Sequence, residues 1–344
     1  MRLIQQLRGV LPVVAMLAVF LAAEGSSAQQ TCIRIMQQDS TLNNLVDPTG
    51  YKTGTLGELG AVKKFGSGKQ AMILIPGLGF GGDVFFEFAE MFSTEATMYA
   101  VTLPGFGGTA APPLPPTTTS YAEQTWTNAA YNAIEQLIDA EKLDRPIVVG
   151  HWLTGSSLAV KLAVDHPDKI RGVILLSGVP CFVPTDTLKY KLHPPLASAA
   201  IGVDRYMAPM WFKTVTRATW DDNNFLPGDY AENPIRGLRL WRMAAEPALH
   251  VWVRYLCEFY AQDVTFDLPK LNVPALLLKP GLEGNFSDPG QDYMTGFCHT
   301  GWNLGIERGA KLTVKTIPHS RACLWFDQPE LVAEEVREFM AGLK

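Results

Sequence analysis

Two loops in the C-terminal part of the chain carry side chains that could move a proton or hold an anion. Glu283 follows the apolar run 275–279, and both His319 and Arg321 follow the run 311–317. A positioned carboxylate or imidazole can serve as a general base, and an arginine in the same pocket can bind a carboxylate or an enolate. Each residue also has an ordinary alternative role. Glu283 can be a solvated loop carboxylate, His319 a surface or strand-capping histidine, and Arg321 a partner in a surface salt bridge.

Short apolar runs rich in Val, Ile and Leu must position these loops. The runs lack the alternation of a half-buried strand, which predicts strands buried on both faces of a parallel sheet. Amphipathic stretches between them predict helices, and strands alternating with helices are typical of an α/β fold. We therefore predict a mostly parallel central sheet flanked by helices. The predicted strands are 71–76, 97–103, 146–150, 172–177, 275–279 and 311–317, and the predicted helices are 83–92, 121–141, 153–166, 288–308 and 328–343.

One interval breaks this rhythm. Residues 181–268 contain no good strand pattern, but they contain helical pieces rich in aromatic residues and methionine. This pattern predicts a helical cap inserted between two strands of a core formed by 56–180 and 269–344. Small apolar molecules are the ligands that such side chains would enclose, although aromatic helices can equally form plain core.

The first 28 residues have the composition of a signal peptide. Arg2 and Arg8 flank the start of an apolar stretch, 9–23, and Ser26 and Ala28 supply small residues at a cleavage point. The alternative is a membrane anchor, but a span needs about 20 apolar residues. We expect a secreted or periplasmic protein that keeps no membrane span after processing. Its mature form would begin with a polar extension, 29–55.

Charge and cysteine content limit the partners. The net charge is −5 without a basic block, which argues against nucleic acid as a partner. No phosphate loop, dinucleotide fingerprint or metal-ligand spacing occurs, so no cofactor and no metal are predicted. The odd cysteine count leaves at least one thiol unpaired within the chain, and buried thiols with at most one bridge are favoured. The cysteines are Cys32, Cys181, Cys257, Cys298 and Cys323.

Four motifs in order resemble the α/β-hydrolase superfamily, over about residues 60–344. They are Pro-Gly-Leu-Gly-Phe at 76–80, Leu-Pro-Gly-Phe-Gly-Gly at 103–108, Val-Val-Gly-His-Trp-Leu-Thr-Gly at 148–155, and Phe-Asp-Gln-Pro-Glu at 326–330. The resemblance implies a nucleophile on a sharp strand-to-helix turn, a histidine base, an acid that orients it, and backbone donors for an oxyanion.

The nucleophile position of that pattern holds Trp152, and no Gly-x-Ser-x-Gly occurs in the chain. Indole offers no atom suited to acyl transfer. Thr154 stands where the motif has its second glycine, so we expect either a relaxed turn or a tryptophan that plugs the pocket floor. Ser156 and Ser157 fall inside the following helix, where packing or local hydrogen bonding explains them.

The other implied positions are also altered. Ala322 occupies the histidine position, with His319 three residues earlier, while Glu283 has the spacing of the acid and Asp288 is close by. Cys323 has no evident base, which favours a buried thiol. His151 is interpreted as structural. The oxyanion donors would be the N–H groups of Leu78 or Gly79, and of Leu153.

Two functions compete. The first is an enzyme that acts on a small apolar carbonyl or ester-like molecule by chemistry other than a triad, with His319 or Glu283 as the base. The second is an inactive hydrolase scaffold that binds a small ligand. A third possibility is that a serine or cysteine elsewhere is the nucleophile. The sequence does not determine the oligomeric state.

Overall fold

The computed structural model describes residues 53–181, 200–214, 226–283, 294 and 296–343. The predicted signal peptide and nearly all of the polar extension lie outside the described residues, and so does Asp288. The start of the predicted helix 288–308 is outside them too; its described end forms η7 (Gly296–Thr300) and α15 (Gly301–Glu307).

A seven-stranded sheet with the order β1-β3-β2-β4-β5-β6-β7 forms the centre of the molecule. All pairs are parallel except the antiparallel pair of β1 and β3. Every residue of β4 and β5 is buried, as the apolar runs predict. This confirms the predicted α/β fold. The bounds are β1 Ala61–Phe65, β2 Gln70–Ile75, β3 Ala96–Thr102, β4 Ile147–His151, β5 Gly172–Leu176, β6 Ala275–Pro280 and β7 Thr313–Ile317.

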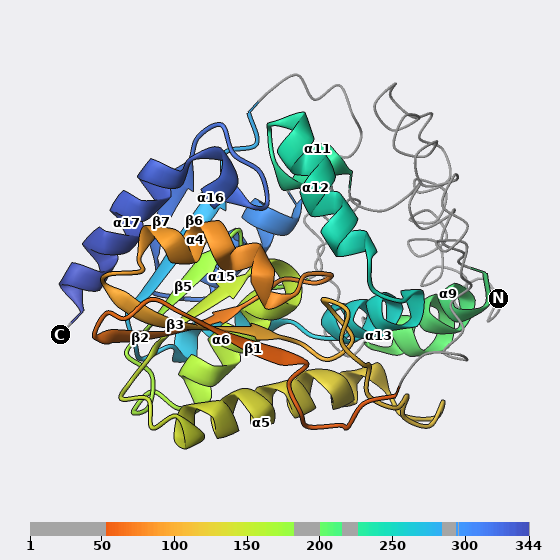
Figure 1. Cartoon of the computed structure of the whole chain (residues 1–344). Coiled ribbons are helices and arrows are strands. Elements are labelled where there is room, and N and C mark those ends of the chain that lie inside the picture. The colour runs from red at the N-terminus through yellow and green to blue at the C-terminus, as the bar shows by residue number, and fades with distance from the viewer. Residues whose placement is uncertain (1–52, 182–199, 215–225, 284–293, 295, 344) are drawn as a thin grey trace.

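Helices cover both faces of the sheet (Figure 1). The helices α4 (Phe86–Met91) and α17 (Pro329–Gly342) lie on one face, and α5 (Thr125–Ala140) and α6 (Trp152–Asp165) lie on the other. The predicted helix 121–141 is interrupted at Gln124, whose left-handed backbone (φ 52°) separates the 3₁₀ turn η3 from α5. Short helical turns complete the layers: η2 Gly82–Phe85, η3 Tyr121–Glu123, η5 Val264–Phe266, η6 Leu268–Lys270 and α16 Leu324–Asp327.

Between β5 and β6, the described residues form helices gathered to one side of the sheet (Figure 1). Every residue of α13 is buried, so this helix belongs to the core as much as to the surface layer. None of the described helices is long and apolar enough to cross a membrane. The bounds are η4 Val203–Met207, α9 Ala208–Thr214, α11 Pro227–Tyr230, α12 Pro234–Ala245 and α13 Leu249–Tyr260.

A buried carboxylate, Glu258, ties α13 to α5 and is paired with an arginine of its own helix. Glu258 and Arg254 pair at 2.7 Å with almost no exposure. The Glu258 carboxylate also accepts from the N–H groups of Trp126 (3.0 Å) and Thr127 (2.8 Å), and from the Thr127 hydroxyl (2.7 Å). The first turn of a helix has N–H groups without intrahelical partners. Glu258 therefore caps α5 from a distant part of the chain.

Replacing Glu258 by Ala should destabilise the protein strongly, because it leaves Arg254 buried without its counter-charge and uncaps α5. Breaking a buried pair on one side costs about 3 kcal/mol or more. Chemical denaturation of Glu258→Ala beside the exposed control Glu90→Ala measures the difference. Equal free energies of unfolding for the two variants would show that the pair does not stabilise the fold.

Candidate functional site

The turn between β4 and α6 keeps the sharp geometry of a nucleophile elbow. Trp152 is the first residue of α6 and has a φ of 56°. A Cβ on Gly155 would lie 2.4 Å from the Ile75 carbonyl oxygen, and a Cβ on Gly150 would lie 2.5 Å from that of Gly155. Gly155, not residue 154, thus allows the close approach of helix and strand. Of the two expected outcomes, the relaxed turn does not occur.

The Trp152 side chain is completely buried. A Cβ on Gly77, in the loop after β2, would lie only 2.3 Å from the Trp152 Cβ, so the loop and the elbow are in direct contact. A bulky residue with positive φ costs of order 1–3 kcal/mol and persists only where its surroundings hold it. Burial of the whole indole offsets part of that cost, since a large aromatic side chain contributes the most apolar area to a core.

His151 links three parts of the site. Its Nδ1 accepts from the Gly77 N–H (3.3 Å), so its proton lies on Nε2 and is donated to the Ala322 carbonyl (3.1 Å). The ring also meets Trp325 edge-on, with 4.9 Å between centroids. Burial lowers the pKa of His151 to about 3, against the raising effect of the Ala322 hydrogen bond. The imidazole is therefore neutral at physiological pH, and its hydrogen bonds fit a structural role.

Ala322, at the implied histidine position, is fully buried beside this ring. The next residue brings a thiol to the same place: the Cys323 Sγ lies 3.9 Å from the His151 Nε2. No sequence motif indicated that this imidazole lies beside Cys323. Burial, and then the charge of Asp327, raise the pKa of Cys323 well above its usual value, so the thiol stays protonated. The described cysteines are all buried: Cys181, Cys257, Cys298 and Cys323.

The predicted acid, Glu283, contacts the predicted base, His319, but it contacts the backbone of that residue and not its imidazole. The Glu283 carboxylate accepts from the His319 backbone N–H (2.7 Å), while the His319 side chain is exposed. Burial raises the pKa of Glu283, but that hydrogen bond and the charges of His319 and Arg321 outweigh it and lower the pKa overall. Arg321 donates to the Glu283 carbonyl (2.8 Å) and pairs with Glu232 of the loop between α11 and α12 (3.4 Å). A catalytic role for these residues remains a prediction.

The predicted oxyanion donors lie at the carboxyl ends of β2 and β4. Leu78 and Gly79 are buried, and Gly79 has a φ of 90°. Neither of their N–H groups donates a hydrogen bond to another described residue. Leu153 is in the first turn of α6, where N–H groups lack intrahelical partners. A role for these backbone groups as oxyanion donors stays a prediction. Trp252 of α13 lies against Gly79, a contact that no motif indicated.

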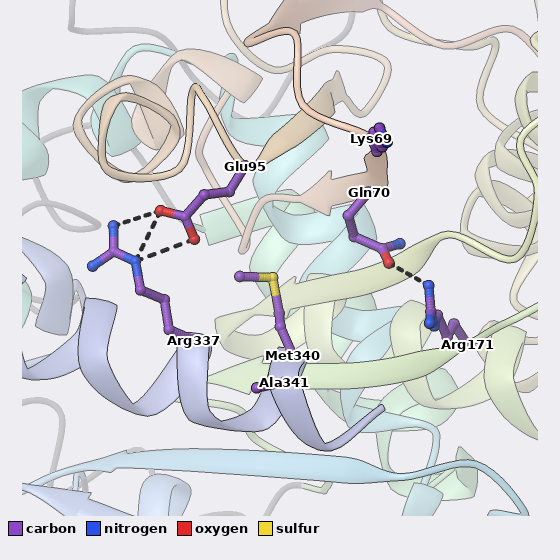
Figure 2. Close-up of a pocket in the computed structure, with 7 residues that line it drawn as sticks. All are labelled: Lys69, Gln70, Glu95, Arg171, Arg337, Met340 and Ala341. Carbon is purple, nitrogen blue, oxygen red and sulfur yellow. Dashed lines mark hydrogen bonds and ion pairs between the residues drawn. The ribbon is translucent and has the colours of Figure 1, made fainter. Parts of the chain in front are cut away.

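A polar hollow lies at the opposite edge of the sheet, where strands β2, β3 and β5 begin (Figure 2). Three of its charged groups are already engaged: Arg337 pairs with Glu95 at 2.9 Å, and Arg171 donates to Gln70 at 2.8 Å. Ligands of open α/β sheets bind outside the carboxyl ends of the strands. This hollow is therefore not the candidate site. Its lining residues are Lys69, Gln70, Glu95, Arg171, Arg337, Met340 and Ala341.

The buried imidazole predicts a specific pH dependence of stability. Because the pKa of His151 is about 3 in the folded protein and near 6.5 when unfolded, the unfolded chain binds the extra proton first. The contribution of neutral His151 to the free energy of unfolding is complete above pH 6.5. It is lost as the pH falls towards 3, by up to about 1.4 kcal/mol per pH unit. Unfolding free energies between pH 4 and 7 should fall less steeply for His151→Asn than for the unmodified protein. The exposed control His319→Asn should keep the steep slope, and a slope unchanged in His151→Asn would contradict the assignment.

Comparison with known proteins places this site in a family. A model of the alpha/beta hydrolase family matches residues 72–335. The chain is 28% identical over 117 residues to a pimeloyl-[acyl-carrier protein] methyl ester esterase of Edwardsiella ictaluri, a match that covers 34% of this chain and only 40% of the esterase. It is 26% identical over 222 residues to the esterase of that name from Aeromonas hydrophila, covering 63% of this chain and 78% of the esterase. An esterase structure from Exiguobacterium antarcticum shares the fold, with a TM-score of 0.57, 14% identity, and coverage of 82% of this chain and 95% of that one. The chain belongs to the alpha/beta hydrolase family.

Proposed function

We propose that this chain is an exported member of the family that has lost ester hydrolysis by a catalytic triad and keeps the hydrolase fold as a non-catalytic scaffold. One observation carries the proposal: the nucleophile position is filled by the fully buried Trp152, with Ala322 at the histidine position. Without a nucleophile and a base, the backbone donors of the site cannot start acyl transfer.

Two other residues near the elbow, Ser156 and Cys323, could in principle replace the missing nucleophile, but their contacts do not support that role. The Ser156 hydroxyl donates to the Leu153 carbonyl (3.0 Å) and accepts from the Val179 N–H (3.0 Å), so it serves the packing of α6 against the end of β5. Cys323 is fully buried, and its neighbour His151 uses its Nε2 proton on a carbonyl oxygen. A thiol becomes a strong nucleophile only as the thiolate.

Proton-transfer chemistry is the second candidate function. The cluster of Glu283, His319 and Arg321 favours it, because it combines a carboxylate, an imidazole and a guanidinium. The geometry of the cluster argues against proton transfer by the imidazole. The described hydrogen bonds of His319, to Glu283 and Gln328, are made by its backbone. A pH-dependent reaction lost in both Glu283→Gln and His319→Asn would identify this cluster as the base.

The unmodified mature protein should not hydrolyse short p-nitrophenyl esters above the buffer background, and a fluorophosphonate serine reagent should not label it. Iodoacetamide should react rapidly with the described cysteines, Cys181, Cys257, Cys298 and Cys323, only after denaturation, because these cysteines are buried. The measurement is specific activity at each purification step, together with the mass of the labelled protein. Constant specific activity or stoichiometric labelling would overturn the proposal, and loss of that activity in Cys323→Ser would then name the nucleophile.

Export is tested by the N-terminus of the protein recovered from cells. Expression of the full chain in a bacterium should yield a periplasmic or secreted form that begins at Gln29, because Ser26 and Ala28 place small residues before that bond. Intact mass and N-terminal sequencing measure this. A cytosolic product that retains Arg2 and Arg8 would contradict export.

A further inference from the structure

The loop that carries the predicted oxyanion donors is covered by one side chain from α13. A Cβ placed on Gly79 would lie 2.3 Å from the Trp252 Cζ2 and 2.9 Å from the Ala244 carbonyl oxygen. The indole of Trp252 therefore lies in van der Waals contact with the glycine backbone, with no room for even a methyl group between them. Trp252 is only 1% exposed, so no solvent layer separates it from its surroundings.

Trp252 is held in place both by its indole nitrogen and by its backbone. Its Nε1 donates to the Ala244 carbonyl at 2.6 Å, which ties it to the last turn of α12. Its backbone belongs to α13, the helix that Glu258 fastens to the first turn of α5. Because these partners are buried, the indole can leave this position only if α13 moves as a whole. A smaller side chain at 252 would also uncover the loop.

We infer that Trp252 is the residue that excludes small molecules from the oxyanion loop, and that a smaller residue at 252 opens a site for a small aromatic or aliphatic carboxylate. This inference rests on the proposed function, in which the backbone donors survive without the triad. The ligand class follows from the surroundings. The Leu78 and Gly79 N–H groups make no hydrogen bond within the described residues and can donate to an anionic oxygen.

The loop beside the indole is itself apolar. Leu78 precedes Gly79 in this loop and shows no exposure. Apolar cavities made by truncating a large core residue stay dry and bind benzene-sized molecules. A cavity at 252 differs from such a cavity in one respect: it would adjoin the backbone of Gly79, whose N–H group makes no hydrogen bond within the described residues. The cavity at 252 should therefore bind benzoate more tightly than a purely apolar cavity does.

The test compares two tryptophan truncations of matched burial. Trp252→Ala opens space at the oxyanion loop, while Trp126→Ala opens space beside the Pro113 carbonyl, to which the Trp126 Nε1 donates at 3.1 Å. Both cavities should bind benzene, measured by ligand-observed NMR. Benzoate at pH 7 should bind Trp252→Ala at least about tenfold more tightly than Trp126→Ala. Trp252→Leu, a milder truncation, repeats the comparison if Trp252→Ala does not fold.

Several results would overturn the inference: equal benzoate affinity in the two variants, no benzoate binding in Trp252→Ala or Trp252→Leu, or benzoate binding to the unmodified protein that matches Trp252→Ala. None of these depends on catalysis. Ester turnover by the unmodified protein would instead overturn the proposed function, so the two failures can be told apart.

Discussion

A neutral, fully buried imidazole holds the candidate site together. His151 accepts from the loop after β2 and donates to the loop after β7, while its own backbone ends β4 and begins the turn into α6. Each of these segments would otherwise bury a polar backbone group without a partner, at a cost of about 1–3 kcal/mol each. One side chain thus holds together loops from distant parts of the chain.

The two altered positions complement each other in size. The motifs assign Trp152 to the nucleophile position and Ala322 to the histidine position, and both residues are completely buried. Cores tolerate change best when total volume is kept. Together with Trp252 of α13, which lies against Gly79, the Trp152 side chain fills this region with packed core. In the proposed function, this packing takes the place of triad chemistry.

The fold was predictable because buried parallel strands are apolar along their whole length. Strand β1 was missed for the complementary reason: its central residues, including Lys63 and Lys64, are exposed and leave no apolar run. The motifs also predicted which loops meet at the elbow. They could not show that Gly155 takes over the close contact expected at 154, or that Cys323 lies beside His151. Those facts depend on how separate segments pack, which no local spacing encodes.

The most direct measurement is ¹⁹F NMR of the protein labelled with 5-fluorotryptophan, with the Trp152 resonance identified by its absence in Trp152→Phe. A fluorine nucleus shielded from water shows no solvent isotope shift between H₂O and D₂O. The structure predicts no such shift for Trp152, because its side chain is completely buried, and no change when a short ester is added. A clear isotope shift, or a resonance that moves as the ester binds, would contradict a closed site.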